Sequence, residues 1–336
     1  MHKVYDAEDA AVYALLLNQG ELVFSLSEKQ NFSLKGANII FGAAEVLHGL
    51  EGNTMNTRMI SVYSGSDSTI TKIPNANLKK FITLYNIGFN ITRVVARTVQ
   101  KSNQLIAYYN ENFLNENHHP KKHYIKYYNT ILALEKDAEN RQIKRLEAFA
   151  NLKKQTIAYR KGSLFAAKPK SIQHELEGKR IDEYKAEFPP GSVICKQNAP
   201  ASDLFILNKG RVRVLLGEEE VARIDKPGTI FGEMSLFLNE PRSATLIADA
   251  NTLVTIINRE SLPVISGRIP DFFLRITTTL WVRFKTNIEM IQELENLKPE
   301  SALFDLQTLQ REIGDFMKSE RIYWLKTYVD ELQNAF

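Results

Sequence analysis

The stretch FGEMSLFLNEPRSAT, residues 231–245, decides how this chain folds. Gly232 has no Cβ, so it allows a tight turn and a close approach by another group. Residues 233–238 favour a short helix, and the first N–H groups of a helix have no partner within it. Arg242 then supplies a planar, permanently charged group that fits phosphate oxygens. The stretch therefore predicts a cradle for an anion.

Glu233 is unusual beside an anion unless its carboxylate accepts hydrogen bonds from ligand hydroxyls. A cyclic nucleotide offers both partners, one phosphate charge and a free ribose 2′-hydroxyl. The pattern F-G-E-x-[AGS]-L-x(4)-P-R-x-A-[TS] runs through residues 231–245. It resembles the phosphate-binding cassette of the cyclic nucleotide-binding domain family, which includes catabolite-activator-type regulators and protein kinase A regulatory subunits. The alternative is an intact but empty cassette, with Arg242 paired to Glu233 or to another carboxylate.

The resemblance implies a role for each cassette residue. Arg242 should pair with an exocyclic phosphate oxygen, and Glu233 should accept the 2′-hydroxyl. Further phosphate contacts should come from backbone N–H groups and a hydroxyl of Gly232, Met234, Ser235, Ser243 and Ala244. The start of the family's last helix aligns with residues 269–271, which puts Arg283 near Glu233 and Asn287 near the base. We expect cAMP as the ligand, with cGMP as the alternative.

An internal repeat gives a second signal. Residues 16–23 (LLNQGELV) resemble 206–213 (ILNKGRVR), and 40–42 (IFG) match 230–232. The residue numbers differ by 190 in both matches (16 and 206, 40 and 230). This spacing indicates two copies of one β-roll. Each copy should contain two strands joined by a hairpin turn over Asn-x-Gly.

The first copy departs from the cassette where the ligand would lie. At the positions of Glu233 and Ser235 it has Ala43 and Glu45. No Pro-Arg follows at cassette spacing, and Arg58 comes several residues late. An alanine cannot hold a ribose hydroxyl, and Glu45 near a helix start could itself substitute for the anion. We expect a vestigial roll that supports packing or a partner, with a different ligand bound through Arg58 as the alternative.

The remaining sequence predicts the helices and the architecture. Helical spacing follows Thr69-Ile70 and continues to Tyr108, one helix spans Tyr124–Tyr159, and another runs from about Asp271 to Leu297. The segment equivalent to Phe188–Gln197 would start before Met1 in the first copy. We expect an α+β protein with two antiparallel, jelly-roll-like β-rolls, each followed by helices. The predicted domains are 1–112 (degenerate cyclic nucleotide-binding-like), 113–180 (helical basic connector), 181–297 (cyclic nucleotide-binding) and 298–336 (C-terminal helical extension).

Composition narrows the class of protein. The chain has 336 residues with a formal net charge of +4, which suits two domains without an overall polycation. A single cysteine, Cys195, excludes an internal disulfide framework. No signal peptide pattern follows Met1, and no stretch is apolar for long enough to form a membrane helix. We therefore expect a cytoplasmic protein without membrane insertion.

Two further features lead to expected absences. His118, His119 and His123 lie in a polar segment without a carboxylate at ligand spacing, so we expect no metal site. Basic residues crowd the connector from Lys121 to Lys170, but acidic residues are interspersed, so a solvated helical face is favoured and nucleic-acid binding is not expected.

The expected function is a sensor. No nucleophile–base pair or paired carboxylates stand out, so we do not expect an enzyme. Binding of the cyclic nucleotide should be relayed through the C-terminal helices to an unidentified protein partner, with a homodimer as an open alternative. A Crp/Fnr-type transcription regulator is the second candidate, although residues 298–336 are too few for a recognisable DNA-binding domain. A ligand-free structural scaffold is the third.

Overall fold

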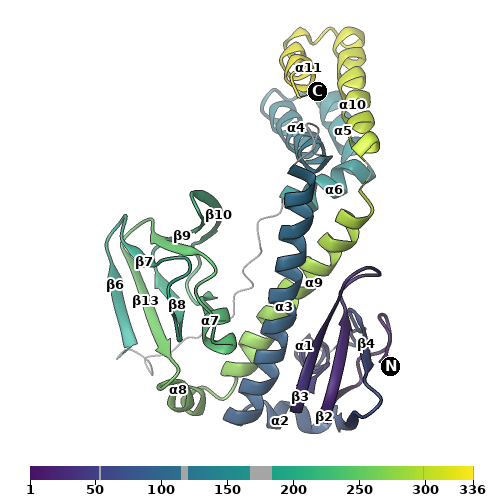
Figure 1. Ribbon diagram of the computed structural model, residues 1–336. Coiled ribbons are helices and arrows are strands. Elements are labelled where there is room, and N and C mark those ends of the chain that lie inside the picture. Colours follow the sequence, from purple (N-terminus) through teal and green to yellow (C-terminus); the bar gives the residue numbers. More distant parts are fainter. Residues whose placement is uncertain (53, 115–119, 167–183, 298, 336) are drawn as a thin grey trace. The chain divides into compact units, whose positions relative to one another are not determined.

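The computed structural model describes residues 1–52, 54–114, 120–166, 184–297 and 299–335 (Figure 1). Contacts divide the chain into two compact units. The first unit holds Met1–Asn103 and Lys168–Ile288, and it contains both β-rolls. The second holds Gln104–Ala167 and Glu289–Phe336, and its described part is helical. The expected α+β fold class is confirmed, whereas the predicted domain boundaries at 112, 180 and 297 stay predictions.

The first roll is one antiparallel sheet followed by helices. Its strands lie in the order β1-β4-β2-β3. The fifth strand, β5, also pairs with β2, along the half of β2 that β4 leaves free. The elements are β1 (His2–Tyr5), β2 (Tyr13–Ser25), β3 (Asn31–Phe41), α1 (Ala44–Gly52), β4 (Ser61–Ser64), β5 (Thr69–Pro74), α2 (Asn75–Phe81) and α3 (Tyr85–Leu114). Leu17, Leu22 and Val62 are fully buried, which fits strands with one face in a core.

The second roll has two antiparallel sheets, each of four strands: β10-β9-β12-β7 and β11-β8-β13-β6. The strands are β6 (Lys185–Phe188), β7 (Val193–Cys195), β8 (Asp203–Lys209), β9 (Val212–Leu216), β10 (Glu219–Ile224), β11 (Ile230–Phe231), β12 (Thr245–Ala248) and β13 (Thr252–Asn258). The helices are α7 (Glu233–Leu238), α8 (Leu262–Arg268) and α9 (Phe272–Glu295). Helix α7 has the bounds that the sequence predicts.

Strand pairing confirms that the two rolls are copies of one pattern. The first half of β2 pairs with β5 as β8 pairs with β13, and its second half pairs with β4 as β9 pairs with β12. In register, Leu17 lies opposite Ile70 and Leu207 opposite Val254. The offset between the copies is thus 190 before the cassette (17 and 207) and 184 after it (70 and 254). The first copy therefore has six extra residues in between.

Two expectations about the strands are wrong. Strands β8 and β9 form no hairpin, because they belong to different sheets and the chain turns a corner between them at Gly210. Gly210 has a φ of 96°, and a Cβ there would lie 2.5 Å from the Asn251 carbonyl oxygen, so the corner requires glycine. The first copy also does not lack all of the segment equivalent to Phe188–Gln197. Strand β1 pairs with β4 as β7 pairs with β12, and only β6 has no counterpart among the described strands.

The second unit is a bundle around a buried apolar cluster. Its elements are α4 (Pro120–Asn140), α5 (Lys144–Lys154), α6 (Ile157–Ala166), α10 (Pro299–Ser319), a 3₁₀ turn (Tyr323–Leu325) and α11 (Lys326–Gln333). The single helix expected over Tyr124–Tyr159 is therefore wrong. Gln142 adopts a left-handed conformation with a φ of 56°, which ends α4 before α5 begins.

Basic residues of the connector form ion pairs within this unit. The pairs are Lys126–Glu331, Arg145–Glu320, Lys153–Glu312, Lys154–Glu135 and Lys161–Glu293. Acidic partners are thus interspersed among the basic residues, but Lys153 and Lys161 are mostly buried and do not belong to a solvated face. The two histidines at 118 and 119 and the polar linker at 167–183 lie outside the described residues. Among the described helices, none is both long and apolar enough to cross a membrane.

Candidate cyclic nucleotide site

The cassette of the second roll is built around a close contact between Gly232 and Arg242. Gly232 precedes α7 with a φ of 72°, a left-handed conformation that favours glycine. A Cβ at this position would lie 2.7 Å from Nη1 of Arg242. Nη1 also donates to the Gly232 carbonyl oxygen at 2.9 Å. The glycine therefore lets the arginine lie directly against the helix start.

The guanidinium of Arg242 is buried and has a counter-charge. Nη2 donates to Oδ1 of Asp203 at 2.5 Å, and Nη1 donates to the Asp203 carbonyl oxygen at 2.8 Å. The group also lies over the ring of Phe205, 4.7 Å from its centroid. Asp203, at the start of β8, is thus the other carboxylate that the empty-cassette alternative requires. Sequence reasoning missed it, because nothing in the cassette pattern points 39 residues upstream.

Within the described part of the chain, one nitrogen of the Arg242 guanidinium has no partner. Its Nε is buried and has no hydrogen-bond partner among the described residues. A buried donor without a partner costs free energy, typically about 1–3 kcal/mol. An anion at the cassette would satisfy this group, which is the chemistry that a phosphate oxygen supplies.

Glu233 and Arg283 lie together. Glu233 is 3% exposed, and its Oε1 accepts a hydrogen bond from Nη1 of Arg283 on α9. Nη2 of Arg283 contacts the Ile230 carbonyl oxygen at 3.4 Å. The structure thus brings the two residues together as the alignment of the last helix predicts. Contact of either with a ribose stays a prediction.

Asn287 is hydrogen-bonded to helix α3. Its amide donates to Oγ of Ser102 at 2.8 Å and to Oδ1 of Asn103 at 2.7 Å, and both acceptors are on α3. The amide is thus occupied by another helix, and a contact between Asn287 and a base stays a prediction.

The other predicted contact residues follow the cassette backbone. Ser235 is buried, Met234 and Ala244 are half-buried, and Ser243 is exposed. Near them, the Cys195 thiol lies 4.0 Å from the Ala244 carbonyl oxygen. Burial raises the pKa of Cys195, so this thiol is less reactive than an exposed one.

Helix α3, which follows the first roll in sequence, also holds the cassette of the second. Glu240 pairs with Nη1 of Arg97 at 2.6 Å and accepts a second hydrogen bond from Gln100. The rings of Phe89 and Phe237 lie 5.2 Å apart. Sequence reasoning missed these contacts, because they join residues about 140 positions apart.

Arg58 is the structural counterpart of Arg242 in the first roll. Nη1 of Arg58 donates to the Gly42 carbonyl oxygen at 2.6 Å, as Nη1 of Arg242 donates to Gly232. Their numbers differ by 184, the offset found after the cassette, which explains why Arg58 comes late. The backbone bonds also match: Glu8 N to Arg58 O, Arg58 N to Asp9 O, Asn198 N to Arg242 O and Arg242 N to Ala199 O.

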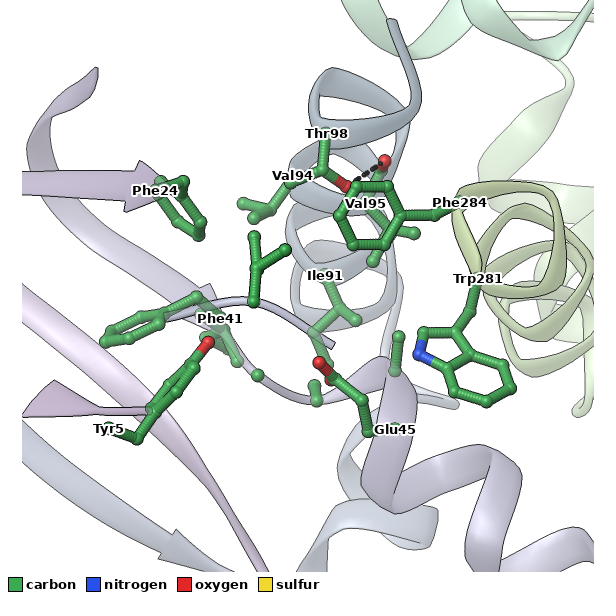
Figure 2. Close-up of a pocket in the computed structure, with 15 residues that line it drawn as sticks. Tyr5, Phe24, Phe41, Glu45, Ile91, Val94, Val95, Thr98, Trp281 and Phe284 are labelled. Carbon is green, nitrogen blue, oxygen red and sulfur yellow. Dashed lines mark hydrogen bonds between the residues drawn. The ribbon is translucent and has the colours of Figure 1, made fainter. Parts of the chain in front are cut away.

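The hollow of the first roll is an apolar pocket (Figure 2). Its empty volume is about 420 Å³, including space open to solvent. The roll contributes rings such as Phe24 and Phe41, α3 contributes Val94 and Val95 among others, and α9 contributes Trp281 with Phe284. Such a lining suits no ribose or phosphate, which need polar partners.

Comparison with known proteins matches the second roll. The family model for the cyclic nucleotide-binding domain covers residues 185–265. A cGMP-dependent protein kinase of Plasmodium berghei is 40% identical over 88 residues, which are 26% of this chain and 10% of that protein. A cAMP-dependent protein kinase regulatory subunit of Hypocrea atroviridis is 29% identical over 108 residues, which are 32% of this chain and 22% of that protein.

The matched region is thus about a tenth to a fifth of the length of these relatives. A solved structure of the regulatory domain of Toxoplasma gondii PKA with cAMP covers 80% of this chain and 79% of its own. Its sequence identity is 16% and its TM-score 0.23, which does not establish a shared overall arrangement.

Proposed function

We propose that the second roll, a cyclic nucleotide-binding domain over residues 185–265, binds one cyclic nucleotide and acts as a regulatory sensor. The observation that carries the proposal is the buried, unpartnered Nε of Arg242 beside the cassette helix. A cyclic phosphate would accept from this donor, and Glu233 would accept from the ribose 2′-hydroxyl. We keep cAMP as the first candidate, as expected from the sequence, and cGMP as the second. Both stay candidates, since the relatives include a cGMP-dependent protein kinase and a cAMP-dependent protein kinase regulatory subunit.

The contacts of Glu233 suggest how binding would change the protein. Glu233 now pairs with Arg283 of α9, so a ribose hydroxyl would compete with that helix for the carboxylate. A ligand shifts an equilibrium when its contacts differ between two states. Helix α9 continues past Ile288 to Glu295 and thus enters the second unit. We infer that this helix relays binding to the C-terminal helices and to a protein partner.

In this proposal the nucleotide is bound and released unchanged, so we propose no enzymatic step at the cassette. The transcription-regulator alternative is disfavoured by packing, because α10 and α11 share one buried cluster with α4–α6 and leave no separate DNA-binding domain among the described residues. The scaffold alternative is favoured by one observation, the pairing of Arg242 with Asp203.

Calorimetric titration separates the sensor from the scaffold. We expect cAMP or cGMP to bind wild type with one site per chain, and Arg242→Ala to weaken binding by about 100-fold or more, because a charge-assisted hydrogen bond is lost. Arg211→Ala, which removes an arginine paired with Asp249 at the surface, is the matched control and should bind as wild type does. Negligible heats in wild type and in Arg242→Ala alike would leave the scaffold.

A further inference from the structure

We propose that the first roll carries its own ligand: the Glu45 carboxylate occupies the place beside Arg58 that the second roll keeps for an anion. The first roll then needs no nucleotide and cannot take one. The inference relies on the proposed function only for the identity of the anion in the second roll.

The two arginines define equivalent places. The guanidinium of each arginine donates a hydrogen bond to the carbonyl oxygen of the glycine that precedes the cassette helix. The backbone of each arginine forms the same two hydrogen bonds with a preceding loop. In that loop, Glu8 and Asn198 both have left-handed backbones, with φ of 71° and 64°. A group near Arg58 can therefore be compared directly with a group near Arg242.

Glu45 fills the place beside Arg58. It is the second residue of helix α1, and the equivalent residue of the second roll is Ser235. Its side chain is 8% exposed, and Oε2 lies 3.7 Å from Nη1 of Arg58. The Arg58 guanidinium and the nearby backbone amides of Glu45 and Met59 favour the charged carboxylate and oppose the rise in its pKa that burial causes. An arginine beside a helix start is the kind of surroundings that binds an anion.

The source of the counter-charge differs between the rolls. Asp203 balances Arg242 from β8, but the first roll has Tyr13 at the equivalent position, which offers only its carbonyl oxygen and its ring. Among the described residues, Glu45 is the carboxylate within 4 Å of Arg58. Without Glu45, the buried guanidinium would have no negative partner, which is costly in a dry interior.

The lining of the rest of the hollow does not suit a nucleotide. Ala43 stands where the second roll has Glu233, so no acceptor awaits a ribose hydroxyl. Trp281 and Phe284 of α9 line the pocket together with α3 (Figure 2). The ring of Trp281 also lies beside the ring of His48 on α1, with centroids 4.3 Å apart and the planes tilted by 35°. In this proposal the first roll gives α9 a packing surface that does not depend on nucleotide. Arg283 of the same helix contacts the second roll.

The test removes the Glu45 carboxylate from its position beside Arg58 and then supplies an anion from solution. Glu45→Ser installs the residue that the second roll has there, and Arg242→Met disables the second roll. We expect Glu45→Ser to lower the melting temperature, and sodium phosphate or acetate to restore it more than sodium chloride of equal ionic strength does. The double variant Glu45→Ser/Arg242→Met should show the same anion response, because the anion would bind at Arg58.

The outcomes decide the proposal separately from the proposed function. No anion response in Glu45→Ser, or a response that disappears with Arg242→Met, would overturn it. If Glu45→Ser does not fold, the single variant Arg242→Met decides, read by the NMR signal of the Met59 amide. Phosphate and cAMP should leave that signal unshifted in Arg242→Met, and a saturating shift would show an open site and overturn the proposal. Failure of wild type to bind cyclic nucleotide would reject the sensor and leave this result intact.

Discussion

The two rolls hold equivalent arginines, Arg58 and Arg242, in the same backbone frame, yet the carboxylate that balances each one comes from a different element. Arg242 is balanced by Asp203 on β8 and keeps a buried donor without a partner. Arg58 is balanced by Glu45 on α1. The comparison teaches that the two rolls differ in the origin of the counter-charge and not in the arginine, and our two proposals rest on this difference.

Transferring the carboxylate is the strongest way to test this difference. Ser235→Glu places a carboxylate in the second roll where the first has Glu45, and we expect cyclic nucleotide binding to fall by about 100-fold or more, because the new charge repels phosphate and competes for its donors. Calorimetry with cAMP measures the effect. Ser319→Glu adds the same charge at an exposed helix end and should bind normally. Undiminished binding by Ser235→Glu would contradict the equivalence of the two places.

The two cassette glycines allow a paired test. A Cβ at Gly42 or Gly232 would lie 2.6 or 2.7 Å from the respective arginine, and both residues have positive φ. We expect Gly42→Ala and Gly232→Ala each to lower the free energy of unfolding by about 1–3 kcal/mol, measured by urea titration. Only Gly232→Ala should also weaken nucleotide binding. Equal loss of binding in both variants would mean that the first roll takes part in it.

The pH dependence of stability sharpens the account of Glu45. Burial raises the pKa of its carboxyl in the folded protein, and Arg58 with two backbone N–H groups opposes the rise. The folded state therefore holds this proton more tightly than the unfolded state. The part of the stability that the bound proton contributes is fully present below the usual carboxyl range and is lost as pH rises through the raised pKa, whereas the pairing of the ionised carboxylate with Arg58 remains. Wild type should lose stability relative to Glu45→Ser from about pH 4.5 upward. Parallel urea midpoints across this range would mean that the carboxyl titrates normally.

The smallest expected effect concerns the contact of α3 with the second cassette. Glu240→Asn installs the residue type found at the equivalent position 56 and breaks the pairs with Arg97 and Gln100. These side chains are about one-third exposed, so we expect a loss of about 0.2–1 kcal/mol in the free energy of unfolding. Lys3→Ala, which removes a surface pair, is the control. A loss of several kcal/mol would show that this contact holds the two rolls together.

The sequence by itself determined the cassette, the bounds of α7 and the repeat at an offset of 190, because glycine turns, helix starts and spaced arginines are local patterns. It also pointed to the pairing of Arg283 with Glu233, through the alignment of one helix start. It misjudged the chain at Gly210, where a glycine that suits a hairpin turn instead carries the strand from one sheet to another.

Only the tertiary structure decided which charges meet. Six extra residues hid the equivalence of Arg58 with Arg242, since a loop insertion changes spacing along the chain but not the place where the strand returns. Asp203 meets Arg242 through the folding of the roll, which joins residues 39 positions apart, and burial places Glu45 beside Arg58, in the role of anion substitute that the sequence suggested. Whether an arginine remains available to a ligand depends on the low-dielectric surroundings that the whole fold creates, and no local pattern encodes them.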